Sequence, residues 1–245
     1  MLPRIRQAVV VTTELEPVVA RLRSFLGRYV EVPEPFRDEG VGHFGLENAV
    51  LAVGDSFLEV LAPVEPDTAG GRHLQRRGGD SGYMVMLQVA DMAATRERLA
   101  ALNIRVVWDT ERPDAVDVHL HPLDVPGALV AVDTMNPPDS WRWGGPAFAG
   151  VDVPQSGSGL SGLTVAVKDP AAAAARWAAV ADASVESDAV ILDGGRQRID
   201  FVPASAERNG LVGIGFALAG AADTEKLTIG DTTIEIRPER KADHG

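Results

Sequence analysis

The sequence predicts an α+β fold built from tandem βαβββ modules, three of them full and a fourth truncated. A strand–turn–strand phrase at residues 45–63 returns at 229–236, so that Gly54-Asp55 matches Gly230-Asp231 and Glu59 matches Glu235. The order of one strand, one helix and further strands also begins three times along the chain. Modules that repeat at this length are expected to stack and share a core, because one small sheet leaves a face unburied.

The first module opens with alternating residues at 6–12, which predict a strand. Apolar residues at helical spacing then predict a helix over 15–26, which ends at Gly27. The repeated phrase predicts a β-hairpin with strands at 47–53 and 56–61 around the Gly54-Asp55 turn. We expect a further strand around residues 29–32.

The later modules follow the same order. The second has an expected helix at 92–102, and its strands are expected at 83–89, 105–108, 117–121 and 128–133. The third has an Ala-rich helix at 171–180, and its strands are expected at 163–167, 189–192 and 197–202, with Asp200 in the place of Glu59. The fourth keeps only a strand at 212–218 and a hairpin at 226–236, because too few residues lie between them for a helix.

The modules are expected to form two domains. Modules one and two make residues 1–136, and the rest make a degenerate second domain at 160–240, followed by a tail at 241–245. Residues 137–159 have the Pro, Gly and Ser content of a linker. Trp141 and Trp143 within it are expected to anchor the linker to the core.

Composition excludes several classes of function. The chain has 245 residues, a net charge of −12 and no cysteine, so disulfides, thiolate nucleophiles and sulfur-bound metals are excluded. The acidic charge argues against nucleic acid as a partner. No apolar run approaches the roughly 18 residues of a membrane span, and the run at 8–11 is too short for a signal peptide. We therefore expect a cytoplasmic protein whose partner is a small molecule, with a homodimer left open.

Three phrases carry a resemblance to a known superfamily. They are GDSFLEVLAP at 54–63, HLQRRGGDSGYM at 73–84 and HPLDVPGALVAV at 121–132. Together with the tandem modules, they resemble the vicinal oxygen chelate superfamily, which has the glyoxalase and bleomycin-resistance fold, and within it methylmalonyl-CoA epimerase. The resemblance implies that modules one and two curl into a cup, in which four inward side chains hold one divalent metal.

Position by position, this chain departs from that metal site. Gln7 stands where the family has its first His, and Glu59 stands on a ligand position of the last strand. Met84 and Ala131 occupy the other two positions and cannot bind a hard metal. We therefore expect no metal and no other cofactor.

Two residues are candidates for proton transfer. Glu59 shares a strand face with Phe57 and Leu61, and the resemblance turns this face into the cup, where desolvation would raise its pKa towards that of a general base. The alternative is that the carboxylate is only a structural habit of the repeat. His43 lies near the place of a catalytic carboxylate of the epimerases, and the alternative for it is an ordinary loop histidine.

The candidate ligand-binding residues are Gln7, His121, Arg72 and Arg76. His119 and His121 share a face of one predicted strand, a spacing that would suit a metal. The resemblance of the His121-Pro122 phrase to the epimerases, in which this His is not a metal ligand, favours packing or substrate contact instead. The arginines, with Arg77, could hold the phosphates or carboxylate of an acyl-CoA, or they could be the solvated face of a short helix. Asp133 could replace the carboxylate missing at Ala131, but we interpret it as a turn residue at a strand end.

Two functions remain open from the sequence. The first is an isomerase- or lyase-like enzyme that moves a proton next to a carbonyl, on an acyl-CoA or a related acid, with His43 and Glu59 as acid and base. The alternative is a non-catalytic binding or resistance protein of the same fold. The epimerase-like phrases favour the first, and the missing metal ligands favour the second.

Overall fold

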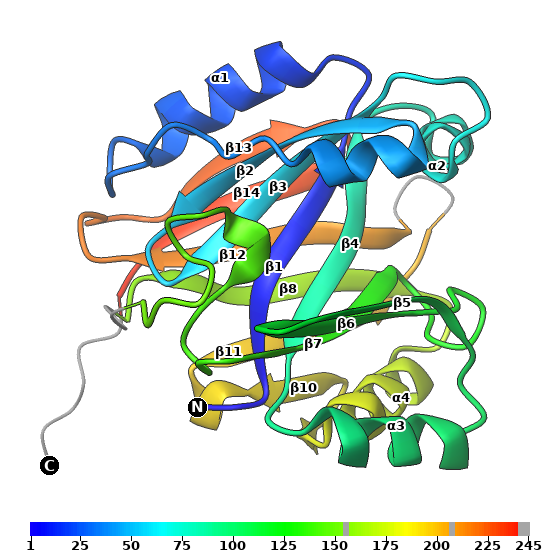
Figure 1. Ribbon diagram of the computed structural model, residues 1–245. Helices are drawn as coiled ribbons and strands as arrows, with labels where there is room; N and C mark the ends of the chain where they lie inside the picture. Colours follow the sequence, from blue (N-terminus) through cyan, green and yellow to red (C-terminus); the bar gives the residue numbers. More distant parts are fainter. Residues whose placement is uncertain (154–156, 206–208, 240–245) are drawn as a thin grey trace, which may run out of the picture.

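The computed structural model describes residues 1–153, 157–205 and 209–239. Two seven-stranded sheets form the molecule (Figure 1). The first, sheet A, has the strands β1 (Arg4–Val11), β2 (Leu46–Val53), β3 (Ser56–Pro63), β4 (Ser81–Gln88), β5 (Val106–Arg112), β6 (Ala115–Leu120) and β7 (Leu129–Met135). The second, sheet B, has β8 (Gly159–Val167), β9 (Ser184–Glu186), β10 (Ala189–Leu192), β11 (Gln197–Pro203), β12 (Gly210–Leu218), β13 (Glu225–Ile229) and β14 (Thr232–Pro238).

The helices lie between these strands in the chain. The α-helices are α1 (Leu15–Leu26), α2 (Ala69–Arg77), α3 (Met92–Ala101) and α4 (Pro170–Ala181), and the 3₁₀ helices are η1 (Glu39–Phe44), η2 (Arg142–Gly144) and η3 (Asp193–Gly195). In α1 the buried residues recur at helical spacing, as an amphipathic helix requires. In α4 the Asp169 side chain accepts from the backbone N–H of Ala172, and Pro170 fills the first helical position. None of the described helices is long and apolar enough to cross a membrane.

The two sheets repeat one plan. In sheet A the order is β2-β3-β1-β4-β7-β6-β5, with β1 parallel to β3, β4 parallel to β7, and β1 antiparallel to β4. In sheet B the order is β13-β14-β12-β8-β11-β10-β9, with the same pairing of first and last strands. Each sheet is therefore two modules joined through their first strands, which confirms the predicted α+β fold of glyoxalase-like modules.

Module one differs from the prediction in one element. Residues 29–32 form no strand, and the nearest pairing is a single bridge between Phe36 and Val50. Pro33 and Pro35 explain the difference, because a proline has no N–H to give to a ladder. Module one is thus βαββ, modules two and three are βαβββ, and module four has three strands and no helix.

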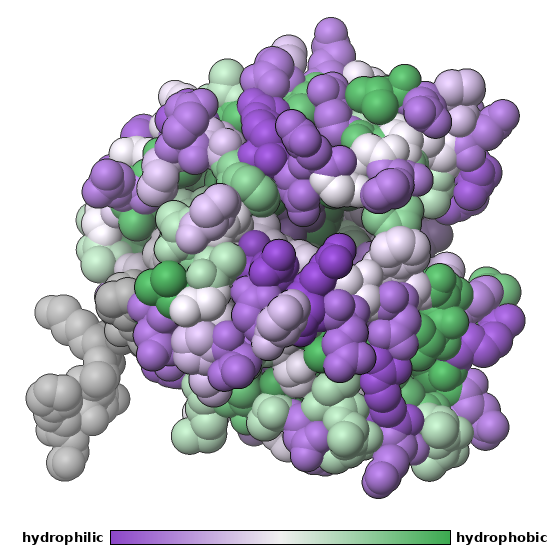
Figure 2. All heavy atoms as spheres, in the orientation of Figure 1, coloured by the Kyte–Doolittle hydropathy of each residue, from purple (hydrophilic) through white to green (hydrophobic). Residues whose placement is uncertain are grey.

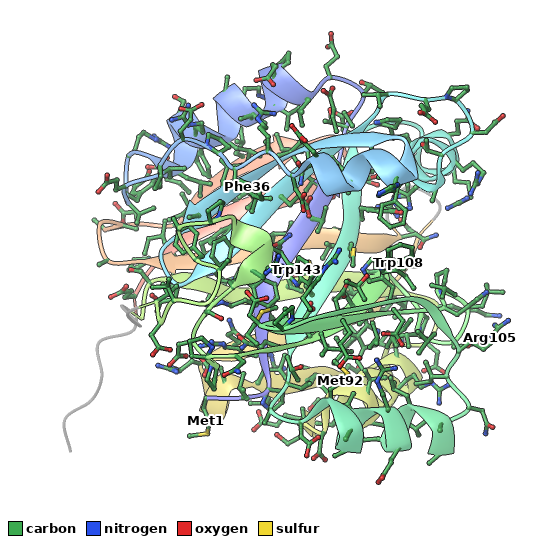
Figure 3. The ribbon with its side chains drawn as sticks, in the orientation of Figure 1. Met1, Phe36, Met92, Arg105, Trp108 and Trp143 are labelled. Carbon is green, nitrogen blue, oxygen red and sulfur yellow. The ribbon has the colours of Figure 1, made fainter. Side chains whose placement is uncertain are left out.

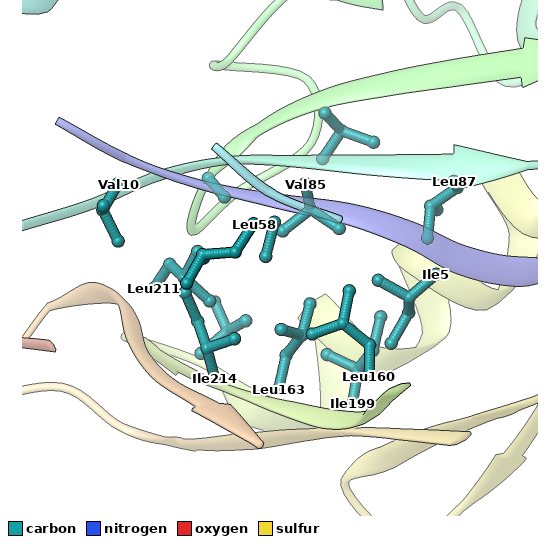
Figure 4. Packing of buried hydrophobic residues seen from close by; sticks show 14 of the residues in the cluster. Ile5, Val10, Leu58, Val85, Leu87, Leu160, Leu163, Ile199, Leu211 and Ile214 are labelled. Atoms are coloured by element: carbon teal, nitrogen blue, oxygen red, sulfur yellow. The ribbon is translucent and has the colours of Figure 1, made fainter. Parts of the chain in front are cut away.

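The main core lies between the sheets. Figure 4 shows residues of β1, β3 and β4 facing residues of β8, β11 and β12, and the labelled side chains are Ile5, Val10, Leu58, Val85, Leu87, Leu160, Leu163, Ile199, Leu211 and Ile214. The buried sides of α1, α3 and α4 extend the same cluster. One face of sheet A is thereby used for the core, and the other face is left for a site.

Candidate functional site

The other face of sheet A carries a second cluster of buried residues, which we call the cup. Its buried apolar members are Val9, Val11, Leu46, Val50, Phe57, Leu61, Leu74, Met84, Met86, Ala115, Ala131, Met135 and Trp141. In the space-filling view, the surface is hollowed between the half that carries α1 and α2 and the half that carries β5 and β6 (Figure 2). The polar side chains of the cup are few, so each one needs an account.

Glu59 is a polar residue of the cup wall, on β3. It is buried, with 8% of its surface exposed. Its Oε2 accepts from Gln7 Nε2 at 2.7 Å, and its Oε1 accepts from Asn48 Nδ2 at 2.7 Å. The structure thus brings Gln7 and Glu59 together, and it adds Asn48, which the sequence did not single out.

Both amides are fixed as donors to Glu59. The Gln7 Oε1 accepts from the indole N–H of Trp141 at 2.7 Å, and the Asn48 Oδ1 accepts from the backbone N–H of Asp38 at 2.8 Å. Each amide must therefore present its N–H groups to the carboxylate. Burial raises the pKa of Glu59 to about 7, and the hydrogen bonds from Asn48 and Gln7 oppose that rise. A carboxyl group with this pKa can take and return a proton near neutral pH.

The repeat alone does not account for this environment. In sheet B, Asp200 is half-exposed and pairs with Arg198, at 2.6 Å between Oδ1 and Nε. Glu235 contacts Lys226 Nζ at 3.0 Å and also contacts Arg237. Burial alone would raise the pKa of Glu235, but these two cations together lower it below its ordinary value. Glu59 occupies the matching position with two neutral amides in place of a cation.

A second polar group of the cup involves two aspartates. Asp117 on β6 and Asp133 on β7 are directly opposite in the antiparallel ladder, and both are buried. Asp133 Oδ1 accepts from the indole N–H of Trp143 at 2.6 Å, and Asp117 Oδ2 lies 3.0 Å from His119 Nε2. Asp117 Oδ1 and Asp133 Oδ2 have no donor, and burial together with the charge of Asp117 raises the pKa of Asp133 well above its ordinary value. Asp133 is therefore a buried residue of β7, and our interpretation as a turn residue was wrong.

Residues 137–153, which we call the strap, close one end of the cup. Trp141 is fully buried and stacks on Phe57, with ring centroids 6.1 Å apart, and Phe148 meets the same ring edge-on at 5.0 Å. At Gly144 an added Cβ would lie 2.3 Å from the Phe57 ring. The burial of Trp141 confirms the prediction that it anchors this segment to the core. The Gly144 backbone lies so close to the Phe57 ring that no side chain fits at position 144.

The residues at the family's four ligand positions do not fit a divalent metal. Glu59 uses both oxygens for amide hydrogen bonds, and Gln7 turns its oxygen towards Trp141. Met84 and Ala131 complete the positions with a thioether and a methyl group. Among the described residues there is also no group of three His, Asp or Glu side chains that could hold a metal ion.

The remaining candidates lie outside this network. His43 is an exposed residue of η1, and the partners of Glu59 do not include it. His121 follows the end of β6, where its Nδ1 accepts from the Leu123 N–H at 3.2 Å and lies 3.2 Å from Arg105 Nη2. His121 therefore lies just outside the strand predicted at 117–121, and its contacts are with Arg105 and with the loop that follows β6.

The three arginines of the predicted cluster all lie on α2, and they differ in burial. Arg77 is mostly buried and pairs with Asp231 at 2.5 Å, which ties α2 to the last hairpin of sheet B. Arg72 and Arg76 are exposed. Burial raises the pKa of Tyr83, and the charges of Arg76 and Arg72 oppose that rise. Tyr83 packs against the cup cluster. The charges of Arg72 and Arg76 thus act on a residue that packs against the cup.

Sequence reasoning missed Asn48, Trp141 as a donor, and the Asp117–Asp133 pair. Asn48 was detectable as a polar residue among the apolar positions of β2. The indole donors of Trp141 and Trp143 come from a segment without periodicity, so no sequence pattern could predict which acceptors they contact.

Comparison with known proteins agrees with this architecture. A model of the glyoxalase-like domain family matches residues 7–181, which is more than half of the chain. No curated protein matches. A hypothetical protein from Staphylococcus aureus has a similar structure over 96% of this chain and 98% of its own, with 14% identity and a TM-score of 0.68.

Two epimerase structures are similar over one half of the molecule. A methylmalonyl-CoA epimerase from Mycobacterium tuberculosis is 19% identical over 53% of this chain and 85% of its own, with a TM-score of 0.46. Another, in complex with methylmalonyl-CoA and NH4⁺, is 25% identical over 55% and 96%, also with a TM-score of 0.46. On the match of the family model and the repeated modules, this chain belongs to the glyoxalase-like domain family of the vicinal oxygen chelate superfamily.

Proposed function

We propose that the protein is a small-molecule enzyme that moves a proton next to a carbonyl group, with Glu59 as the acid–base group and without a metal ion. The observation that carries the proposal is the environment of Glu59, which is buried, bonded to two neutral amides and has a pKa of about 7. A carboxyl group that is half ionised near neutral pH serves as a base in one step and as an acid in the next.

In the proposed reaction, a Glu59 oxygen takes the proton from the carbon next to the carbonyl. The electron pair of the broken C–H bond moves towards the carbonyl oxygen, and the reverse transfer returns the proton. His119 lies on the cup side of β6 and lowers the pKa of Glu59, so we assign it the contact with the carbonyl oxygen. His43, on η1, remains our proposed acid for exchange with solvent.

We propose an acyl-CoA or a related acid as the substrate class. The epimerase-like phrases support this class, as do Arg72 and Arg76, whose charges act on Tyr83 beside the cup. Guanidinium groups bind phosphate and carboxylate through paired hydrogen bonds. A cytoplasmic location and the absence of a nucleic-acid partner remain expectations.

The direct test is exchange of the α-proton in D2O. Chelator-treated protein, checked by elemental analysis to hold no metal, would be incubated with methylmalonyl-CoA and a panel of other acyl-CoA thioesters, and deuterium uptake would be followed by mass spectrometry. We expect uptake from at least one thioester, and a loss of about 100-fold or more in the Glu59→Gln variant, the usual contribution of a general base.

Glu235→Gln is the matched control, because Glu235 occupies the same position of the repeat but contacts Lys226 and Arg237. We expect it to keep the wild-type rate. Equal rates for wild type and Glu59→Gln, or uptake only after metal is added, would contradict the proposal.

A second candidate function is binding without catalysis. It is favoured by the strap, because Trp141 and Phe148 fill part of the cup against Phe57. A binder would retain an acyl-CoA in equilibrium dialysis but would leave its α-proton unexchanged. The same panel of thioesters therefore separates the two functions.

A further inference from the structure

Two exposed aromatic rings meet across the two edges of sheet A, one just before the edge strand β2 and one on the edge strand β5. Phe44 on η1 and Trp108 on β5 are 41% and 40% exposed. Their ring centroids are 4.9 Å apart, at an angle of 72°, which is an edge-to-face contact. Phe44 belongs to module one and Trp108 to module two, so the pair bridges the two modules at the surface.

The strand register places Trp108 on the cup face. Trp108 is the ladder partner of His119, whose Nε2 contacts Asp117 within the cup, and opposite residues of a ladder share a face. The ladder shifts between Val106 and Trp108, so that Val107 is an extra residue on β5. Such a bulge re-aims the side chain next to it. Figure 3 shows Trp108 and Trp143 in the region between the half of the molecule that carries α1 and α2 and the half that carries β5 and β6.

Phe44 belongs to a surface segment that has no buried residue. The 3₁₀ helix η1 buries none of its residues, and it contains Gly40 and Gly42 and ends at Gly45. Gly45 has a φ of 67°, which favours glycine, and an added Cβ at Gly42 would meet nothing within 4 Å. We expect such a segment to open at a lower cost than the buried strands. The other end of η1 is tied to the site, because the Asp38 N–H bonds to Asn48, a partner of Glu59.

We propose that Phe44 and Trp108 form an aromatic gate, which opens to admit a small molecule to the cup and closes on the apolar part of that molecule. The proposal rests on the cup being the binding site of the proposed function. The side chains of the cup and of α2 indicate the ligand class. The aromatic rings and the thioethers of Met84 and Met86 favour an apolar or aromatic body, and the exposed Arg72 and Arg76 on α2 favour an anionic group.

The test uses 8-anilinonaphthalene-1-sulfonate, an aromatic anion that becomes fluorescent in apolar sites. We expect saturable binding to the full-length wild type, with Kd raised at least fivefold and faster dissociation in Phe44→Ala and in Trp108→Ala. Trp108→Phe should restore most of the affinity. The melting temperatures of these variants should stay close to wild type, because both side chains are partly exposed.

Two control variants test whether the probe binds at the gate or elsewhere on the surface. Val185 is 43% exposed on β9, the edge strand of sheet B, and Val107 is 50% exposed beside Trp108. Val185→Ala should bind within twofold of wild type. Three results would overturn the gate. The first is no saturable binding of the probe to the wild type, and the second is unchanged affinity in Phe44→Ala and Trp108→Ala. The third is a loss of affinity in Val107→Ala without a loss of affinity in Phe44→Ala.

The gate and the enzyme proposal fail separately. Glu235→Gln should bind the probe as wild type does, because Glu235 lies on β14 of sheet B, outside the cup. Weaker probe binding in the gate variants, with no α-proton exchange from any thioester, would support the gate and refute the enzyme. Exchange that depends on Glu59 but not on Phe44 or Trp108, with unchanged probe binding, would refute the gate and support the enzyme.

Discussion

The cup buries three carboxyl groups, and the surroundings of two of them, Glu59 and Asp133, favour different charge states. Glu59 receives hydrogen bonds from two amides whose orientation is fixed by Trp141 and Asp38. These donors favour the ionised form and offset part of the cost of burial. Asp133 receives one hydrogen bond, from Trp143, and faces a second carboxyl group. We therefore expect Asp133 to hold a proton at neutral pH.

This expectation gives a prediction for Asp133→Asn. Burial and the neighbouring Asp117 raise the pKa of Asp133 in the folded protein above its ordinary value of 3.8. The folded state then binds more protons than the unfolded state, so the stability contributed by this group is complete below the unfolded pKa and is lost as the pH rises through the folded pKa. Asparagine keeps the oxygen for Trp143, offers an N–H to Asp117, and does not ionise.

We expect Asp133→Asn to be more stable than wild type at pH 8–9, by about 1–3 kcal/mol, and to show a flatter dependence of stability on pH. Urea unfolding at pH 5, 7 and 9 measures both quantities. Asp139→Asn is a suitable control, because this carboxylate is half-exposed and pairs with Arg4. A variant that is less stable than wild type at pH 9 would contradict a protonated Asp133.

At the scale of elements, the two Gly-Asp turns of the repeat join the halves of the molecule. The turn at Gly54 lies against β8, where the Asp55 N–H donates to the Ser158 carbonyl at 2.7 Å. The turn at Gly230 lies against sheet A in the same way, and the Asp231 N–H donates to the Asp80 carbonyl at 3.2 Å. The repeated phrase therefore encodes a docking contact as well as a hairpin.

Gly230→Ala should break one of these contacts. The residue has a φ of 55°, and an added Cβ would lie 1.6 Å from the Asp80 oxygen. We expect a loss of about 3 kcal/mol or more, because backbone strain and overpacking act together. Gly78→Ala isolates the strain, since Gly78 has a φ of 77° and nothing within 4 Å of the added Cβ, and should cost only about 1 kcal/mol. Equal losses in denaturant unfolding would contradict the docking role.

The sequence was sufficient for most elements because most of them are periodic. The predicted helix at 15–26 and the strand at 189–192 have the observed bounds, and the repeat located all four modules. The strand expected at 29–32 is absent because the prolines that follow cannot pair, and the short edge strand β9, Ser184–Glu186, was not foreseen because three exposed residues carry no hydrophobic pattern.

Only the part of the site formed by residues on paired strands could be predicted from the sequence. The alignment of first and last strands placed Gln7 and Glu59 together, and they are hydrogen-bonded. The groups that set the charge of Glu59 come from a neighbouring hairpin strand and from the strap, at Asn48 and Trp141. Asn48 stands out as a polar residue among the apolar positions of β2. The hydrogen bond from Trp141 comes from an irregular segment and depends on tertiary packing, so periodicity does not reveal it.

For the whole molecule, the predicted division into domains stays a prediction, and the packing gives it a sharper form. Sheet A spans residues 4–135, but its core face packs on sheet B, and Phe57 in the cup is covered by the strap. A fragment of residues 1–136 would expose both surfaces. We expect it to melt well below the full chain, with a broader transition in calorimetry. A cooperative melt at the temperature of the full chain would show that the second sheet and the strap contribute nothing to the first.

The central claim is that Glu59 of the whole, metal-free protein titrates near neutral pH. Carbon-detected NMR of protein labelled at the glutamate carboxyl carbons follows each Glu through a pH titration, and the Glu59 signal is assigned by its absence from Glu59→Gln. We predict a pKa near 7 for Glu59, because burial raises it and the amide donors of Asn48 and Gln7 oppose that rise. A pKa at or below the ordinary 4.5 would contradict it, because a carboxylate that stays ionised throughout the physiological range cannot return the proton it takes.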